Sequence, residues 1–77
     1  MPRQRPAPLL ALGAAIRKRR AELGISQEKL AHRAKLDRSY VGGVERGERN
    51  VAYVNILKLA RALDLTGAEL IARAEKD

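Results

Sequence analysis

The sequence QEKLAHRAKLDRSYVGGVER, which occupies residues Gln27–Arg46, predicts two short helices separated by a turn. Ser26 stands directly before this stretch as an N-cap, and an acidic residue follows in the first turn, so we expect a helix that extends to Ala34. Asp37 is expected to cap a second helix, which continues to the end of the stretch and is stopped by Gly47. Both helices have an apolar face, which predicts that each packs against a common core.

The inward positions of these two helices meet the requirements of a helix-turn-helix. In that motif a small residue lies where the second helix crosses the first, and Ala31 stands at this place. Branched apolar residues anchor the second helix to the core, and Val41 and Val44 are placed to do so. The opposite face of the second helix then remains polar and free to enter the major groove of DNA.

The rest of the chain predicts three more helices and no strand. Apolar residues at spacings of three and four positions place them at about Leu9–Leu23, Tyr53–Leu63 and Gly67–Lys76. Thr66 and Glu69 have the spacing of a capping box at the start of the last helix. In the helix that starts at Tyr53, the residues expected to point inward are Tyr53, Ile56, Leu59, Ala60 and Leu63. We therefore predict an all-α fold, a compact five-helix bundle.

The chain is strongly basic. Its 77 residues include 16 Lys and Arg against 9 Asp and Glu, which gives a formal net charge of +7. A small basic domain favours a polyanionic partner, either nucleic acid or an anionic membrane surface. No apolar stretch approaches the roughly 18 residues of a membrane span, so we expect no transmembrane helix, and we expect nucleic acid and not a membrane as the partner.

The composition argues against several other functions. Because the chain has no cysteine, disulfides and thiolate zinc sites are excluded, and a reducing cytoplasm is the simplest location. His32 is the only histidine and the acids are scattered, so no metal site and no catalytic constellation emerges. We therefore expect no enzymatic activity, no cofactor and no small-molecule ligand.

Two segments resemble a known family. Ile25–Ala31 and Leu36–Gly47 resemble the phage-repressor-like, Cro/C1-type (XRE) helix-turn-helix family. The string Asp37–Arg46 is similar to the controller proteins of bacterial restriction–modification systems, and the chain length, the five-helix layout and Arg49-Asn50 match them too. The resemblance extends over nearly the whole chain except the first eight residues. It implies a phage-repressor-like, DNA-binding bundle.

The resemblance implies DNA contacts at the start of both helices of the motif. Gln27 resembles the family glutamine that bonds a DNA phosphate and steadies a neighbouring base contact. Arg38, Ser39 and Tyr40 open the recognition helix, where family members contact bases and backbone. Arg38 suits guanine. Tyr40 has two equally good interpretations: it lies over the DNA backbone, or its ring packs on Ile16 and Leu36.

The resemblance also assigns basic residues at the other end of the recognition helix. Arg46 and Arg49 resemble phosphate-contacting residues of the family. Arg20 and Glu45 resemble a structural pair that links the first and third helices, and such a pair orients elements more than it stabilises them. The remaining basic run, Arg17–Arg19, is interpreted as a solvated face.

The sequence departs from the family pattern at several positions. Gly42 and Gly43 lie in the middle of the recognition helix, and each costs roughly 1 kcal/mol of helix propensity relative to alanine. Gly43 matches the controller pattern, whereas Gly42 stands where relatives usually carry a polar side chain that can reach a base. We therefore expect the bare backbone here to approach the groove closely. Lys35 stands where glycine commonly makes a left-handed turn, and Ala52 stands where a Ser or Thr cap is common.

The two ends of the chain are assigned separate roles. Residues 1–8 contain every proline and are expected to form a flexible basic arm, in which Arg3 and Arg5 would reach a minor groove or attract DNA nonspecifically. Residues 9–77 form the DNA-binding domain. Its last helix is expected to mediate dimerisation, because one small core cannot bury all three of its apolar residues, Leu70, Ile71 and Ala74.

These observations predict a sequence-specific, double-stranded DNA-binding regulator of transcription that binds a pseudo-palindromic operator as a homodimer in the cytoplasm, associated with the nucleoid. The resemblance adds a possible control of restriction–modification genes. The alternatives are a DNA-binding antitoxin of a toxin–antitoxin pair and a basic domain that binds anionic lipid.

Overall fold

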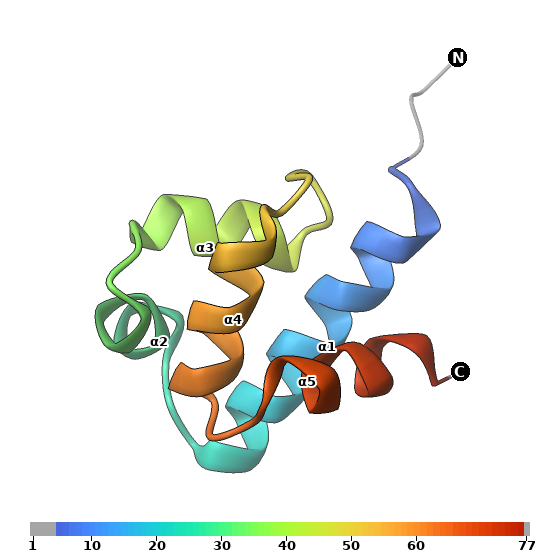
Figure 1. The fold of residues 1–77 in the computed structure, drawn as a ribbon. Coiled ribbons are helices and arrows are strands. Elements are labelled where there is room, and N and C mark those ends of the chain that lie inside the picture. Colours follow the sequence, from blue (N-terminus) through green and yellow to red (C-terminus); the bar gives the residue numbers. More distant parts are fainter. Residues whose placement is uncertain (1–4, 77) are drawn as a thin grey trace.

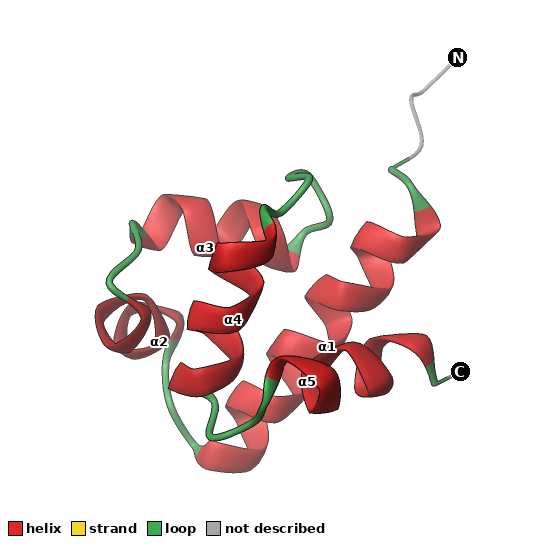
Figure 2. Ribbon diagram, in the orientation of Figure 1, coloured by secondary structure: helices red, strands yellow, loops and turns green. Residues whose placement is uncertain are grey.

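The computed structural model describes residues 5–76, which form five helices and no strand (Figures 1 and 2). The helices are α1 (Ala7–Leu23), α2 (Gln27–Ala34), α3 (Arg38–Glu45), α4 (Tyr53–Ala62) and α5 (Gly67–Glu75). In Figure 1, α5 lies beside α1, and α4 stands between α2 and α5. The all-α prediction is confirmed. No helix among residues 5–76 is long and apolar enough to cross a membrane.

The core lies where the helix pair α2–α3 packs against α1 and α4. The largest fully buried side chains are Ile16, Leu30, Leu59, Leu63, Leu70, Val41 and Val44. Ala31 is also buried, as expected for the residue where the helices of the motif cross. The two valines of α3 therefore turn inward and fix which face of this helix remains available to a partner.

Local signals set the helix ends. The Ser26 hydroxyl accepts a hydrogen bond from the Lys29 amide, and Thr66 and Glu69 form the predicted capping box. Lys35 has a φ of 59°, so it adopts the left-handed turn that usually requires glycine. Asp37 occupies the N-cap position of α3 without a side-chain capping bond.

Helix α1 begins at Ala7, two residues before the predicted start. Proline is tolerated in the first turn of a helix because the amide it lacks has no intrahelical partner there. Pro8 is therefore part of the helix, and the nonhelical part of the described arm is limited to Arg5 and Pro6. Arg3 lies outside the described residues.

Two apolar residues lie elsewhere than predicted. Tyr53 is 71% exposed, so the prediction that it points inward is wrong. Tyr53 is the first residue of α4, and at this end of the helix its ring is exposed to solvent instead of packed in the core. Leu70 is fully buried in the core of its own chain, which removes it from the predicted dimer surface.

The interpretation of Arg17–Arg19 as a solvated face agrees with the exposure of Arg17 and Lys18, whereas Arg19 is partly buried. Arg17 donates a hydrogen bond to the main-chain carbonyl of Glu45, at the end of α3. Arg19 donates to the carbonyl of Leu63, at the end of α4, with an N···O distance of 2.9 Å. Because the last carbonyls of a helix lack intrahelical donors, these bonds link α1 to the ends of two neighbouring helices.

Candidate nucleic-acid interface

The first turn of α3 begins with two exposed residues. Arg38 and Ser39 are exposed there, whereas Tyr40 is partly buried and Val41 is fully buried. Positions 38, 42 and 46 lie on one side of the helix because residues four apart are neighbours. On this side Arg38 and Arg46 are exposed, whereas Gly42 is buried beneath the side chain of Arg46.

A buried carboxylate at the end of α3, that of Glu45, binds an arginine of α1. Glu45 is only 2% exposed, and it accepts hydrogen bonds from Nε and Nη2 of Arg20 at 2.8 and 2.9 Å. The predicted pair between α1 and α3 is therefore present as a two-point contact. The hydrogen bond that Arg20 donates to Glu45 is the main cause that raises the pKa of Arg20.

Through Gln27, the carboxylate of Glu45 is also linked to an exposed residue of α3. The side-chain amide of Gln27 donates to Oε1 of Glu45 at 3.0 Å. Its carbonyl oxygen therefore points the other way, and it accepts a hydrogen bond from Nη1 of Arg38 at 3.4 Å. Arg20, Glu45, Gln27 and Arg38 thus form a continuous chain of polar contacts from α1 to the exposed end of α3.

The two glycines of α3 are covered by arginine side chains. A Cβ placed on Gly42 would lie 3.1 Å from Nη1 of Arg46, and one on Gly43 would lie 3.2 Å from Cγ of Arg49. Both glycines are buried, so the expectation of a bare backbone at this place is wrong. The absence of a side chain instead leaves room for two guanidinium-bearing side chains to lie along the helix.

Tyr40 packs against the core, which is one of the two arrangements that the sequence left open. Its ring contacts the core, and its hydroxyl accepts a hydrogen bond from the side-chain amide of Asn55 at 3.1 Å. The guanidinium of Arg49 lies 5.6 Å from the ring centroid, within the range of a cation–π contact. These contacts hold Arg49 beside the exposed side of α3.

Three charged residues cluster beyond the end of α3. Nε and Nη2 of Arg46 donate to the two carboxylate oxygens of Glu48 at 3.1 and 3.2 Å. Arg5 donates to the same carboxylate at 2.7 Å. The hydrogen bond from Arg46, aided by Arg5, lowers the pKa of Glu48 below its usual value of 4.5, and the same contact raises the pKa of Arg46.

Sequence reasoning missed Glu48 and Asn55. Glu48 meets Arg5 across 43 positions and Asn55 meets Tyr40 across 15, so no local spacing pattern could indicate either contact. His32 is exposed, in agreement with its interpretation as a solvated helix residue. Within residues 5–76 no group of three or more His, Cys, Asp and Glu side chains could hold a metal ion.

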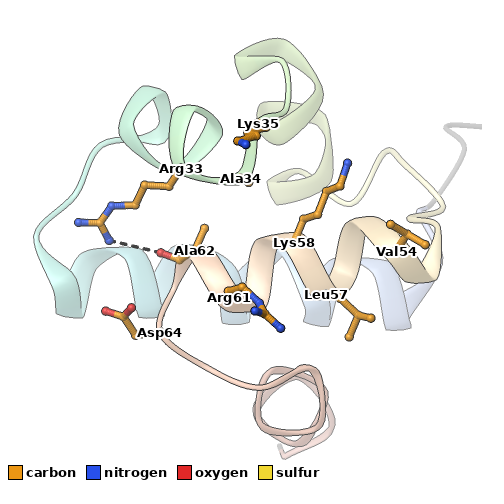
Figure 3. Close-up of a pocket in the computed structure, with 9 residues that line it drawn as sticks. All are labelled: Arg33, Ala34, Lys35, Val54, Leu57, Lys58, Arg61, Ala62 and Asp64. Atoms are coloured by element: carbon orange, nitrogen blue, oxygen red, sulfur yellow. Dashed lines mark hydrogen bonds between the residues drawn. The ribbon is translucent and has the colours of Figure 1, made fainter.

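An open groove of about 600 Å³ lies between α2 and α4 (Figure 3). Its lining residues are Arg33, Ala34, Lys35, Val54, Leu57, Lys58, Arg61, Ala62 and Asp64. Arg33 donates to the carbonyl of Ala62 at 3.3 Å, the contact drawn as a dashed line. The groove has a basic rim, and no sequence pattern predicted it.

Comparison with known proteins identifies the family. A family model described as helix-turn-helix matches residues 16–70. The solved restriction-modification controller protein C.AhdI from Aeromonas hydrophila is 58% identical, covers 84% of this chain and 98% of its own, and superposes with a TM-score of 0.82. Control protein C.MunI from a Mycoplasma species is 39% identical over 77% of this chain and 80% of its own length. The clp gene regulator ClgR from Corynebacterium glutamicum is 30% identical, with 92% and 76% coverage and a TM-score of 0.84. The chain therefore belongs to the helix-turn-helix family of the Cro/C1 type, as its motifs predicted.

Proposed function

We propose that this chain is a sequence-specific regulator of transcription that binds double-stranded DNA at a pseudo-palindromic operator as a homodimer. The observation that carries the proposal is the exposed first turn of α3, where Arg38 is held by Gln27 and, through it, by Glu45. A guanidinium held in place at the start of a recognition helix suits two hydrogen bonds to O6 and N7 of guanine.

The surrounding residues suit phosphate contacts. Arg49 is exposed beside Tyr40, and Ser39 lies in the same turn as Arg38. Phosphate contacts fix the position of a protein on the duplex without reading its sequence. The net charge of +7 strengthens this attraction, which makes affinity depend steeply on salt.

The homodimer is proposed to form through α4 and α5. An apolar groove of about 390 Å³ lies between these helices, and its lining includes Tyr53, Ile56 and Ile71. With Leu70 assigned to the core, Ile71 and the exposed ring of Tyr53 are the large apolar groups that a second copy would cover. Two-fold pairing would place the recognition helices about 34 Å apart, one turn of DNA.

The regulated genes are proposed from the relatives. C.AhdI is a restriction-modification controller protein and C.MunI is a control protein, whereas ClgR is a clp gene regulator. The identity to C.AhdI exceeds that to ClgR, so we favour control of restriction–modification genes. Such a regulator acts on DNA in the cytoplasm, at the nucleoid.

The test is selection of duplexes from a random pool at about 150 mM salt, where nonspecific phosphate attraction is weakened. We expect enrichment of a two-fold symmetric sequence. Binding without an enriched sequence would contradict sequence specificity, and the absence of any binding would favour an interaction module such as an antitoxin.

The dimer is tested by light scattering at micromolar concentration. We expect the mass of two chains for the wild type and of one chain for Ile71→Asp, since a charge cannot be buried unpaired in an apolar contact. The control is Val54→Asp, an exposed apolar residue of α4 outside this groove, which should leave the dimer intact. A monomeric wild type, with and without DNA, would refute the dimer.

A further inference from the structure

We propose that Arg46 reads a base edge in the major groove, in the place of the side chain that Gly42 lacks, and that Glu48 is its positioning residue. This inference rests on the proposed function, because it assigns a second reading position to the same DNA interface. It differs from the role that the family resemblance implied, in which Arg46 contacts phosphate.

The position of Arg46 is the first argument. In a helix, side chains tilt toward the N-terminus, so a residue covers the surface above the residue four positions earlier. Arg46 follows this rule, since its Nη1 lies 3.1 Å from where the Cβ of Gly42 would be. The carbonyl oxygen of Gln27 lies 3.4 Å from the same point, so the guanidinium reaches the middle of the interface that begins at Arg38.

The orientation of the guanidinium is the second argument. The carboxylate of Glu48 accepts hydrogen bonds from Nε and Nη2 of Arg46, which is a side-on, two-point contact. Of the five N–H donors of arginine, this contact leaves both hydrogens of Nη1 and one of Nη2 free, and one hydrogen of each nitrogen forms the end-on edge of the guanidinium. That edge matches the O6 and N7 acceptors of guanine.

The carboxylate of Glu48 also acts against the alternative role of Arg46, which is contact with a DNA phosphate. To bind a phosphate through its side-on edge, Arg46 would have to leave Glu48, and the negative carboxylate would then lie near the DNA backbone. Arg5 binds the same carboxylate at 2.7 Å and helps to hold it in place. Glu48 therefore disfavours phosphate binding through the side-on edge of Arg46 and leaves the end-on edge open to a base, a difference that increases discrimination between DNA sequences.

The experiment measures affinity for the selected duplex and for a panel with each base pair replaced in turn, at about 150 mM salt. The wild type should discriminate at two separate positions in each half-site. Arg46→Ala should lose discrimination at one of them and bind the selected duplex roughly ten- to a hundredfold more weakly. Glu48→Gln should bind duplexes mismatched at that position more tightly than the wild type does.

Two controls separate this role from general charge effects. Arg49→Ala removes the arginine that covers Gly43, and it should weaken binding to every duplex alike. Glu22→Gln removes the same charge as Glu48→Gln from a carboxylate that also bridges two arginines, Arg19 and Arg73, and is similarly exposed, but on α1. It should leave the panel unchanged.

Two outcomes overturn the inference. If Arg46→Ala weakens all duplexes equally, as Arg49→Ala does, then Arg46 is a phosphate contact. If Glu48→Gln and Glu22→Gln give the same panel, then Glu48 does not position Arg46. In both cases a wild type that still discriminates at the position of Arg38 leaves the proposed function standing, whereas a wild type that discriminates nowhere refutes that function as well.

Discussion

Glu45 and Glu48 lie three positions apart and make the same contact in two different environments. Each accepts hydrogen bonds from Nε and Nη2 of one arginine, Arg20 for the first and Arg46 for the second. The side chain of Glu45 is 2% exposed and that of Glu48 is 35% exposed. Burial determines what the shared geometry does, because a charge removed from water must keep its partners whereas an exposed charge can exchange them for water.

Each carboxylate also acts on a residue of the proposed DNA interface. Glu45 holds Gln27, whose other end meets Arg38, and Glu48 holds Arg46 above Gly42. The buried carboxylate therefore couples the folding of the chain to the placement of Arg38. The exposed carboxylate acts on the interface alone, so substitutions at the two positions should have separable effects.

The largest effect is expected from Glu45→Ala, which leaves Arg20 without its carboxylate. Breaking a buried pair by removing one partner typically costs about 3–5 kcal/mol, a large part of the stability of a small domain. Denaturant unfolding monitored by circular dichroism should show this loss. Glu48→Ala should lower the free energy of unfolding only slightly, because an exposed ion pair contributes little to stability, and equal losses at the two positions would contradict the comparison.

A smaller and opposite effect is expected from Gly42→Ala. Alanine is favoured over glycine inside a helix by up to about 1 kcal/mol, so the free energy of unfolding should rise. The new Cβ would lie 3.1 Å from Nη1 of Arg46, the far end of a flexible side chain, which must shift. Discrimination at the position read by Arg46 should therefore decrease while stability increases. Unchanged discrimination would show that the position of the Arg46 guanidinium above Gly42 is not needed for reading a base.

The smallest effect concerns pH. Because Arg46, and then Arg5, lowers the pKa of Glu48 in the folded chain, the unfolded chain binds more protons near its usual value of 4.5. The contribution of this carboxylate to stability is therefore present above that value and is lost as the pH falls through the lowered pKa. Between about pH 5 and pH 3, stability should decrease slightly more for the wild type than for Glu48→Gln. Identical pH profiles would indicate that the contact is absent in solution.

Local sequence signals were sufficient for the fold and for the motif. The caps at Ser26 and Thr66 and the inward valines of α3 predicted the helices near their observed places, because each signal acts within a few residues. The start of α1 differs from the prediction, because proline suits a first helical turn and Pro8 belongs to the helix instead of the arm.

Contacts between distant residues were the part that sequence could not predict. The pairing of Glu48 with Arg5 and the bond from Arg19 to the end of α4 depend on packing across more than 40 positions. The burial of Leu70 has the same origin, because the direction of an apolar side chain on α5 depends on how that helix crosses α1. The Arg20–Glu45 pair is predicted by the family resemblance alone and not by any local spacing pattern.

The most direct test of the account is the binding of Arg38→Ala to the selected duplex and to its single-position panel. We predict that the wild type discriminates against replacement of one guanine in each half-site and that Arg38→Ala loses discrimination there alone, with a cost of about 1–3 kcal/mol in binding free energy. If Arg38→Ala binds every duplex in the panel with the discrimination of the wild type, then the exposed end of α3 does not read DNA and the central claim is wrong.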